Sequence, residues 1–431
     1  MSSAPNPVVS DIADEPPPLW RRFALAFALF LLTGTFGFLQ PFVSLYMQSA
    51  GLNKTQFGAV MALGTATVLL FQPLLGRLSD YLPSRRPVMF LAAICAGCAY
   101  SAYRYADGFW GFLALTAVGV NGFQYLNAAS GALVGQIARS SGGGAAYVRY
   151  RVWGSVGYIV VAVGAGFLVN QVLPKDPVVP RAILDPLFLY GPLVFFALAG
   201  VVLLAPEGRR SLPPIVSAPL NVDEEPLQED AEHAARQRIF NHFLIALGLY
   251  QFSLYGASAY LPYYMRQLGA SPLMITGMFA AGVLCEVLVM RQVGRWTDKF
   301  GRRPALAASL ILMPIRLLLY IPATGPLWVL CVQMLHGINF GIVGTIAVVV
   351  INDLARDHER GAAQARLAVV GGLCSAVGPF VCGYLSDHLG IRPMFALMSL
   401  VGMVSVIYFL KNVRESNPSA IPPHGILRYL A

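Results

Sequence analysis

The chain has 431 residues, of which 56% are hydrophobic and only 12% are charged, and its formal net charge is +9. Soluble globular domains carry about 25% charged residues, so this composition excludes an ordinary soluble protein and indicates one built within a lipid bilayer. The basic residues are scattered over short loops beside apolar segments, so the positive charge indicates membrane topology rather than binding to nucleic acid.

The first 22 residues are expected to be a disordered cytoplasmic tail. Several prolines and acidic residues interrupt them. The apolar run that follows is too long for the core of a signal peptide, so we interpret it as a first membrane-spanning helix.

From residue 23 onward the sequence predicts an all-α membrane protein of twelve transmembrane helices, arranged as two six-helix bundles. Each span has about 20 mainly apolar residues, as a bilayer core of ~30 Å requires. The first bundle, 23–205, holds the spans 23–47, 55–75, 87–106, 109–138, 148–173 and 186–205. The second bundle, 239–411, holds the spans 239–268, 271–293, 304–322, 326–351, 362–385 and 392–410.

Two further segments are expected to lie outside the membrane. Residues 206–238 are rich in acidic residues and proline, and they cannot bury enough apolar surface to fold alone. They are therefore predicted to be a flexible cytoplasmic linker, and residues 412–431 a cytoplasmic tail.

Basic residues set the predicted orientation, because cytoplasmic loops carry an excess of Lys and Arg. With both termini in the cytoplasm, the outward-facing segments hold only Lys54, Arg104, Lys175, Arg181, Arg266 and Arg392 of the 30 basic residues, and Arg316 lies within a helix. The opposite orientation would place the excess outside. We therefore predict a multi-pass protein of the cell inner membrane.

A loop motif occurs once in each half, between the second and third helix of that half. The copies run from Gly76 to Arg86 and from Gly294 to Arg303. The second copy matches the signature G-x-x-x-D-[RK]-x-G-R-[RK] and so resembles the major facilitator superfamily, whereas the first copy departs from it after Asp80. A glycine permits close helix approach, and an aspartate in a basic loop can pair across a gate. The resemblance implies gating roles for Gly76, Asp80, Arg85, Gly294, Asp298, Gly301, Arg302 and Arg303. The alternative is that both loops are merely basic cytoplasmic turns, as the positive-inside rule requires.

The segment from Tyr150 to Tyr158 gives a narrower resemblance. It is similar to the R-x-W-G-S-x-G-[FY] segment of the branch that includes phenylpropionate permeases, and it also resembles nucleoside–proton symporters and lactose permease. Secondary transporters bind substrate near the membrane midplane, at the interface of their repeats.

Three ionisable residues are predicted to lie deep in the second bundle, where such groups are costly and usually functional. At 1.5 Å per residue, Glu286 lies roughly 12 Å, Arg316 roughly 18 Å and His336 roughly 21 Å from the cytoplasmic helix ends. The three could meet in the middle of this bundle. The alternatives are a structural salt bridge between Glu286 and Arg316 and a packing role for His336.

The resemblance to lactose permease extends to these positions and to Arg151, with one departure. The carboxylate of that permease three residues after the histidine is Asn339 here, and its acid on the fourth helix is missing. The resemblance therefore implies proton coupling through Glu286, with His336 as a second candidate, but does not transfer the sugar-binding chemistry. Candidate substrate-binding residues are Arg151, Arg316, Asn127, Gln124, Gln333, Asn339, Tyr250 and Tyr255; the amides could instead join helices.

We predict a proton-coupled symporter of a small organic solute that works by alternating access. Arg151 and Arg316 outnumber the one buried acid, which favours a carboxylate-bearing solute, and a nucleoside or sugar stays open. The alternatives are proton-driven efflux of drugs or metabolites and a transport-inactive sensor or assembly protein with the same fold. The sequence contains no P-loop, H-E-x-x-H or G-x-S-x-G motif, so neither an enzyme, a metal site nor a cofactor is expected. The expected partners are the solute, protons and the bilayer, without nucleic acid, and the expected state is a monomer.

Overall fold

The computed structural model describes residues 18–140, 144–171, 180–205, 227–356 and 359–416. Most of the predicted N-terminal tail, residues 206–226 of the predicted linker and the end of the C-terminal tail lie outside these residues. The described regular structure is entirely helical, which confirms the predicted all-α class.

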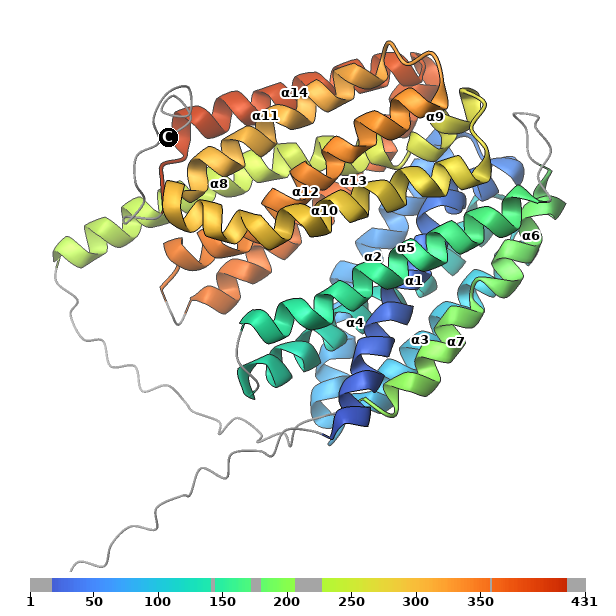
Figure 1. Ribbon diagram of the computed structural model, residues 1–431, viewed down its shortest axis with the longest axis horizontal. Coiled ribbons are helices and arrows are strands. Elements are labelled where there is room, and N and C mark those ends of the chain that lie inside the picture. Colours follow the sequence, from blue (N-terminus) through green and yellow to red (C-terminus); the bar gives the residue numbers. More distant parts are fainter. Residues whose placement is uncertain (1–17, 141–143, 172–179, 206–226, 357–358, 417–431) are drawn as a thin grey trace, which may run out of the picture.

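The helices form two bundles that follow one another along the chain and lie side by side (Figure 1). The N-terminal bundle contains α1 (Leu19–Ser49), α2 (Lys54–Tyr81), α3 (Arg86–Ala102), the 3-10 turn η1 (Tyr103–Tyr105), α4 (Gly108–Ser140), α5 (Gly144–Asn170), α6 (Arg181–Tyr190) and α7 (Leu193–Val202). The C-terminal bundle contains α8 (Leu227–Ser258), α9 (Leu261–Gln267), α10 (Pro272–Phe300), α11 (Arg302–Tyr320), α12 (Pro326–Leu354), α13 (Arg360–His388) and α14 (Ile391–Asn412).

Eleven segments of the described chain are long and apolar enough to cross a membrane. The helix α4 has 33 residues but is not one of the eleven, because its amides, among them Asn121, Gln124 and Asn127, lower its hydropathy. The same amides are the side chains that the sequence marks as candidates for a binding role. The twelve-helix count therefore stays a prediction.

The structure corrects several predicted boundaries. Residues 227–238, predicted to be linker, form the first part of α8, and α1 begins at Leu19 within the predicted tail. His233 in this extension contacts Glu359 at 3.4 Å, so tertiary contacts support a helix that has no apolar run of its own. The predicted spans 186–205 and 239–268 are each two helices, α6 with α7 and α8 with α9, interrupted near Pro192 and Pro262 because proline lacks an N–H donor.

Several helix ends are fixed by local sequence. Asn53 begins α2 with a capping box, in which its side chain accepts from the backbone N–H of Gln56 and the Gln56 side chain accepts from the Asn53 N–H. Ser271 caps α10, and Gly301, with a φ of +97°, separates α10 from α11. This φ is strained for any residue with a side chain.

The bundles meet mainly through α2 against α13 and α5 against α10. Figure 1 shows α5 and α10 running side by side between the two bundles. At the α2–α13 crossing, a Cβ on Gly58 would lie 2.4 Å from the carbonyl oxygen of Pro379. The two helix backbones therefore touch, and only glycine fits at this point of α2.

Candidate functional site

A cavity of about 450 Å³ lies between the two bundles. Residues of α1, α4 and α5 form one wall, and residues of α8, α10 and α12 form the other. The lining includes Thr33, Phe36, Gln40, Asn127, Arg151, Ser155, Tyr158, Tyr255, Ser258, Phe279, Glu286, Gln333, His336 and Phe340. A volume of this size is typical of small-molecule sites.

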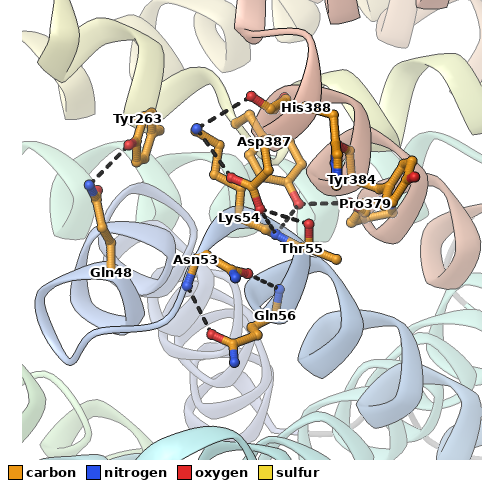
Figure 2. Close-up of polar contacts among 12 residues, drawn as sticks. Gln48, Asn53, Lys54, Thr55, Gln56, Tyr263, Pro379, Tyr384, Asp387 and His388 are labelled. Carbon is orange, nitrogen blue, oxygen red and sulfur yellow. Dashed lines mark hydrogen bonds and ion pairs between the residues drawn. The ribbon is translucent and has the colours of Figure 1, made fainter.

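One end of the cavity is closed by contacts between the bundles (Figure 2). Asp387, at the end of α13, accepts hydrogen bonds from the backbone N–H and the hydroxyl of Thr55, each at 2.7 Å, and lies 3.3 Å from the Lys54 ammonium. The Gln48 amide donates to the Tyr263 hydroxyl at 3.1 Å. The Tyr260 hydroxyl lies between the backbone oxygens of Pro379 and Lys54, at 2.7 and 3.0 Å.

The cavity extends from this closed end toward the α4–α5 connection. Its lining includes Val134 and Arg151, which lie near the ends of α4 and α5 at that connection, and Arg151 is exposed. The two loops with the repeated motif lie at the same end of the bundles, at the ends of α2 and α10. The closed end is thus the one opposite to the loops.

Two glycine contacts fix how the helices that carry the charged lining residues are rotated. A Cβ on Gly157 would lie 2.0 Å from the Phe30 oxygen, so the glycine-containing segment after Arg151 packs α5 directly on α1. A Cβ on Gly337 would lie 2.6 Å from the backbone nitrogen of Glu286, so α12 packs on α10 beside that residue. These contacts leave Arg151 and Glu286 facing the cavity.

The structure places Glu286 opposite the N-terminal bundle. Its electrostatic neighbours are Arg151 and Tyr158, both on α5. The Tyr158 hydroxyl donates to the Gln40 side chain at 2.7 Å, which links α5 to α1 at the same level. The predicted acid therefore lines the cavity, and its basic partner comes from the other bundle.

Glu286 and Arg316, which the sequence allowed to meet, do not meet in this structure. Arg316 is fully buried behind the cavity wall, where it lies close to His336 and Tyr250. Distance along a helix sets the depth of a side chain but leaves its direction open, and α11 turns Arg316 away from α10. No ion pair of Glu286 with Arg316 is present among the described residues.

The other predicted binding residues divide between the cavity and the bundle interior. Gln333, His336, Asn127 and Tyr255 line the cavity, while Gln124, Tyr250 and Asn339 do not. The Asn339 amide, with its nitrogen toward Leu335, donates to the Leu335 oxygen at 2.9 Å and accepts from the Met313 N–H at 3.1 Å. Asn339 thus joins α12 to α11, in agreement with the alternative in which the amides join helices and do not bind substrate.

The second motif loop is tied to neighbouring helix ends of its own bundle. The Glu415 carboxylate accepts from the backbone N–H groups of Arg302 and Arg303 at 3.0 and 2.9 Å and so caps the start of α11. The Arg302 guanidinium lies 2.7 Å from the Asp353 carboxylate and 4.0 Å from that of Asp298. This loop therefore fixes the ends of α11, α12 and α14 relative to each other.

The expected close helix approach at the first glycine of each motif is absent here. A Cβ on Gly76 or on Gly294 would meet no atom within 4 Å among the described residues. Both glycines lie at the end toward which the cavity opens. Asp80 is exposed and Arg85 half-buried at this end, and their gating roles stay predictions.

Several lining and closing residues escaped the sequence reasoning. Gln40 and Tyr158 line the cavity, and Lys54 and Asp387 close its end. Gln40 could have been recognised as an amide within an apolar run, and Tyr158 as the residue two turns after Arg151 on the same helix face. Lys54 and Asp387 carry no such signal, since each is a charged residue at an ordinary helix end.

A family model described as "MFS_1 like family" matches residues 22–397. Among curated proteins, the chain is 25% identical over 400 residues to the maltose permease of Geobacillus stearothermophilus, which covers 90% of the chain and 94% of the permease. It is 23% identical over 395 residues to the uncharacterized transporter YwbF of Bacillus subtilis (strain 168), covering 89% of the chain and 92% of that protein.

Solved structures share the fold at low sequence identity. The nucleoside transporter NupG (D323A mutant) has a TM-score of 0.74 at 13% identity and covers 91% of this chain and 100% of its own. The D-xylose-proton symporter has a TM-score of 0.71 at 16% identity, covering 93% of this chain and 100% of its own.

Proposed function

The chain belongs to the MFS_1 like family, and we propose that this membrane transporter carries a small polar organic solute together with a proton. The relatives and structural neighbours of the chain are transporters and not enzymes. The observation that carries the proposal is the position of Glu286, a carboxyl group in the wall of the central cavity whose basic neighbour, Arg151, belongs to the other bundle.

This placement supports coupling of a proton to the alternating-access movement. An ionised carboxylate in a low-dielectric site is costly unless a cation lies near it. When the bundles rock and the cavity wall of α5 moves away from α10, Glu286 loses Arg151 and the protonated form becomes the less costly one. Proton binding and bundle movement thus influence each other, which is what symport requires.

The side chains that line the cavity support a polar solute that carries hydroxyl groups, a nucleobase or a carboxylate. Amides and hydroxyl groups (Thr33, Gln40, Asn127, Tyr255, Gln333) alternate with aromatic faces (Phe36, Phe279, Phe340). Of the described residues, one arginine and one acid line the cavity, and these do not supply the excess of positive charge that the sequence suggested. Sugars and nucleosides are therefore favoured more than the sequence alone suggests, and a carboxylate-bearing solute can use Arg151. The names of the maltose permease, the nucleoside transporter and the D-xylose-proton symporter agree with these classes.

We further propose the predicted topology: twelve spans with α4 included, both termini in the cytoplasm of the inner membrane, and a monomer. The basic residues of the motif loops lie at the end toward which the cavity opens, opposite to the Lys54–Asp387 closure. By the positive-inside rule, that end faces the cytoplasm. The described conformation is then the one that opens inward, with the outer end closed.

The proposal is tested by proton movement in proteoliposomes. Sugars, nucleosides, aromatic acids and cationic dyes are added in turn to vesicles that contain the wild type or Glu286→Gln, and the external pH is recorded. One solute is expected to drive alkalinisation outside wild-type vesicles, and the variant is expected to lose it. Asp107→Asn is the control, because Asp107 is 96% exposed and pairs with Arg181 inside the N-terminal bundle.

If Glu286→Gln still couples proton to solute movement, Glu286 is structural and the mechanism fails. Movement of protons only from solute-loaded vesicles would favour efflux. A partial match supports that alternative: the multidrug transporter protein MdtP of Bacillus subtilis (strain 168) is 27% identical over 141 residues, or 33% of the chain. No solute-driven movement in either direction would favour a transport-inactive sensor.

A further inference from the structure

Arg316 is a fully buried cation with unused hydrogen-bond donors. Its exposed fraction is 0%, and its Nε and Nη1 atoms have no hydrogen-bond partner in the part of the chain that the structure describes. Its Nη2 atom lies 3.5 Å from the Met313 sulfur, and its guanidinium carbon lies 6.0 Å from the Tyr320 ring centre. None of these contacts supplies a negative charge, and a buried charge without a partner costs several kcal/mol.

Two more buried polar atoms without partners come from neighbouring helices. Among the described residues, the Nδ1 atom of His336, on α12, and the hydroxyl of Tyr250, on α8, are buried without a hydrogen bond of normal geometry, and the Tyr250 hydroxyl lies beside the Ser309 and Asn339 side chains. Both residues lie within electrostatic reach of Arg316 on α11. We call these three residues the Arg316 cluster.

The amide acceptors nearby are already used. The Gln333 side-chain oxygen accepts from the Tyr320 hydroxyl at 2.5 Å. The Asn339 side-chain oxygen accepts from the Met313 N–H, and its backbone oxygen accepts from the Ser309 hydroxyl at 3.1 Å. Glu286, the acid that lines the cavity in the described part of the chain, has Arg151 as its basic neighbour. The cluster therefore offers donors and a positive charge, and no carboxylate of the described residues forms an ion pair with Arg316.

We propose that the Arg316 cluster binds a small monovalent anion, either a chloride ion or the carboxylate of the transported solute. An anion would accept from the Arg316 nitrogens and the Tyr250 hydroxyl and would neutralise the guanidinium. A water molecule would satisfy the same donors but leave the charge uncompensated. His336 lines the cavity and belongs to the cluster, so the two sites adjoin through its ring. In its carboxylate form the proposal rests on the proposed function.

The test is anion-dependent stability of the full-length protein in nanodiscs. The midpoint of thermal unfolding is measured while sodium chloride, or sodium acetate or benzoate, replaces sodium sulfate at constant ionic strength. A saturable rise is expected, because a ligand that binds only the folded state shifts the folding equilibrium about a hundredfold at a hundred times its Kd. Direct binding of radioactive chloride to the same nanodiscs gives the Kd independently.

Variants assign the effect to the cluster. Arg316→Gln is expected to lose the anion dependence, and Arg392→Gln, which changes an exposed arginine of α14 outside the cavity lining, is expected to keep it. Tyr250→Phe removes one hydroxyl only, so it tests the proposal even if Arg316→Gln fails to fold. Loss of one hydrogen bond to a charged group is expected to raise the Kd about tenfold.

Stabilisation by chloride identifies an inorganic ion, and stabilisation by the carboxylates alone identifies the solute's carboxylate. No saturable effect of either anion on the wild type, an undiminished effect in Arg316→Gln, or an unchanged Kd in Tyr250→Phe overturns the proposal. Proton uptake is measured in a separate experiment. Absence of anion binding would therefore not contradict the symport mechanism. Unchanged proton coupling in Glu286→Gln would likewise not contradict chloride binding at the Arg316 cluster.

Discussion

Replacing Asp387 by alanine is expected to open the end of the cavity that Lys54 and Thr55 close. Every hydrogen bond of the Asp387 carboxylate that Figure 2 shows comes from the other bundle. Two of them, to Thr55, are short at 2.7 Å, and the Lys54 ammonium is 3.3 Å away. The variant therefore removes contacts that exist only while this end is closed, and leaves each bundle intact.

The magnitude follows from the exposure of these groups. The Lys54 and Asp387 side chains are 19% and 21% exposed, so water competes only in part. We assign about 1 kcal/mol to each Thr55 hydrogen bond and a few tenths to the ion pair, because the open state hydrates the same groups. The total of about 2 kcal/mol corresponds to a roughly thirtyfold shift toward the conformation with this end open.

The assay is a spin–spin distance between the bundles at this end. Labels on cysteines at Tyr105 and Leu389, two exposed residues of opposite bundles, report the separation in a background without the native cysteines. Wild type is expected to give mainly the short distance, and Asp387→Ala a large added population at a longer one. Asp107→Asn is the control, since it breaks an ion pair within one bundle at the same end.

An unchanged distance distribution in Asp387→Ala would refute the reasoning, because the carboxylate would then contribute nothing to closure. A longer distance in the control as well would show that the labels report local loosening. Asp387→Asn separates charge from hydrogen bonding: it keeps one acceptor for Thr55, so its shift is expected to be smaller than that of alanine.

Four glycine substitutions give further predictions. Gly58→Ala places a Cβ 2.4 Å from the Pro379 oxygen and is expected to lengthen the same spin–spin distance. Gly277→Ala is the control, because its Cβ would have no atom within 4 Å, and it is expected to leave the distance unchanged. The same distance distribution in both variants would contradict the proposed contact of Gly58 with Pro379. Gly301→Ala is expected to destabilise the protein by about 1 to 3 kcal/mol, because the φ of +97° suits only glycine, and to lower the thermal midpoint. Gly294→Ala, in a helix with open space around it, is expected to leave the midpoint unchanged or raise it, and a fall as large as that of Gly301→Ala would contradict this.

The sequence predicted the helical fold and the superfamily because both depend on local features. A bilayer requires each spanning segment to satisfy its own backbone hydrogen bonds, so apolar runs of sufficient length become helices. The resemblance carried by the motif after Gly294 is confirmed by the family match over residues 22–397. Residues 227–238 were missed, since they have no apolar run and are helical beside Glu359 of another helix.

The candidate site was predicted in part. Because an ionisable side chain is costly to bury in a membrane, the sequence indicated Glu286, His336 and Arg316 as candidates for function. Two of them, Glu286 and His336, line the cavity. Depth along the helices placed all three deep within the second bundle. Whether Glu286 and Arg316 meet could not be predicted, because the direction of a side chain depends on how its helix is rotated, and that rotation comes from contacts such as Gly337 on α10.

The sequence by itself thus determined the membrane class, the repeated halves and which buried charges need an explanation, because hydropathy and motif spacing are properties of short segments. Only the tertiary structure decided that Glu286 faces Arg151 across the bundles, that Arg316 lies apart with unused donors, and that Asp387 closes one end on Thr55. Each of these depends on helices far apart in the chain meeting at a particular rotation and depth, and no short segment contains that information.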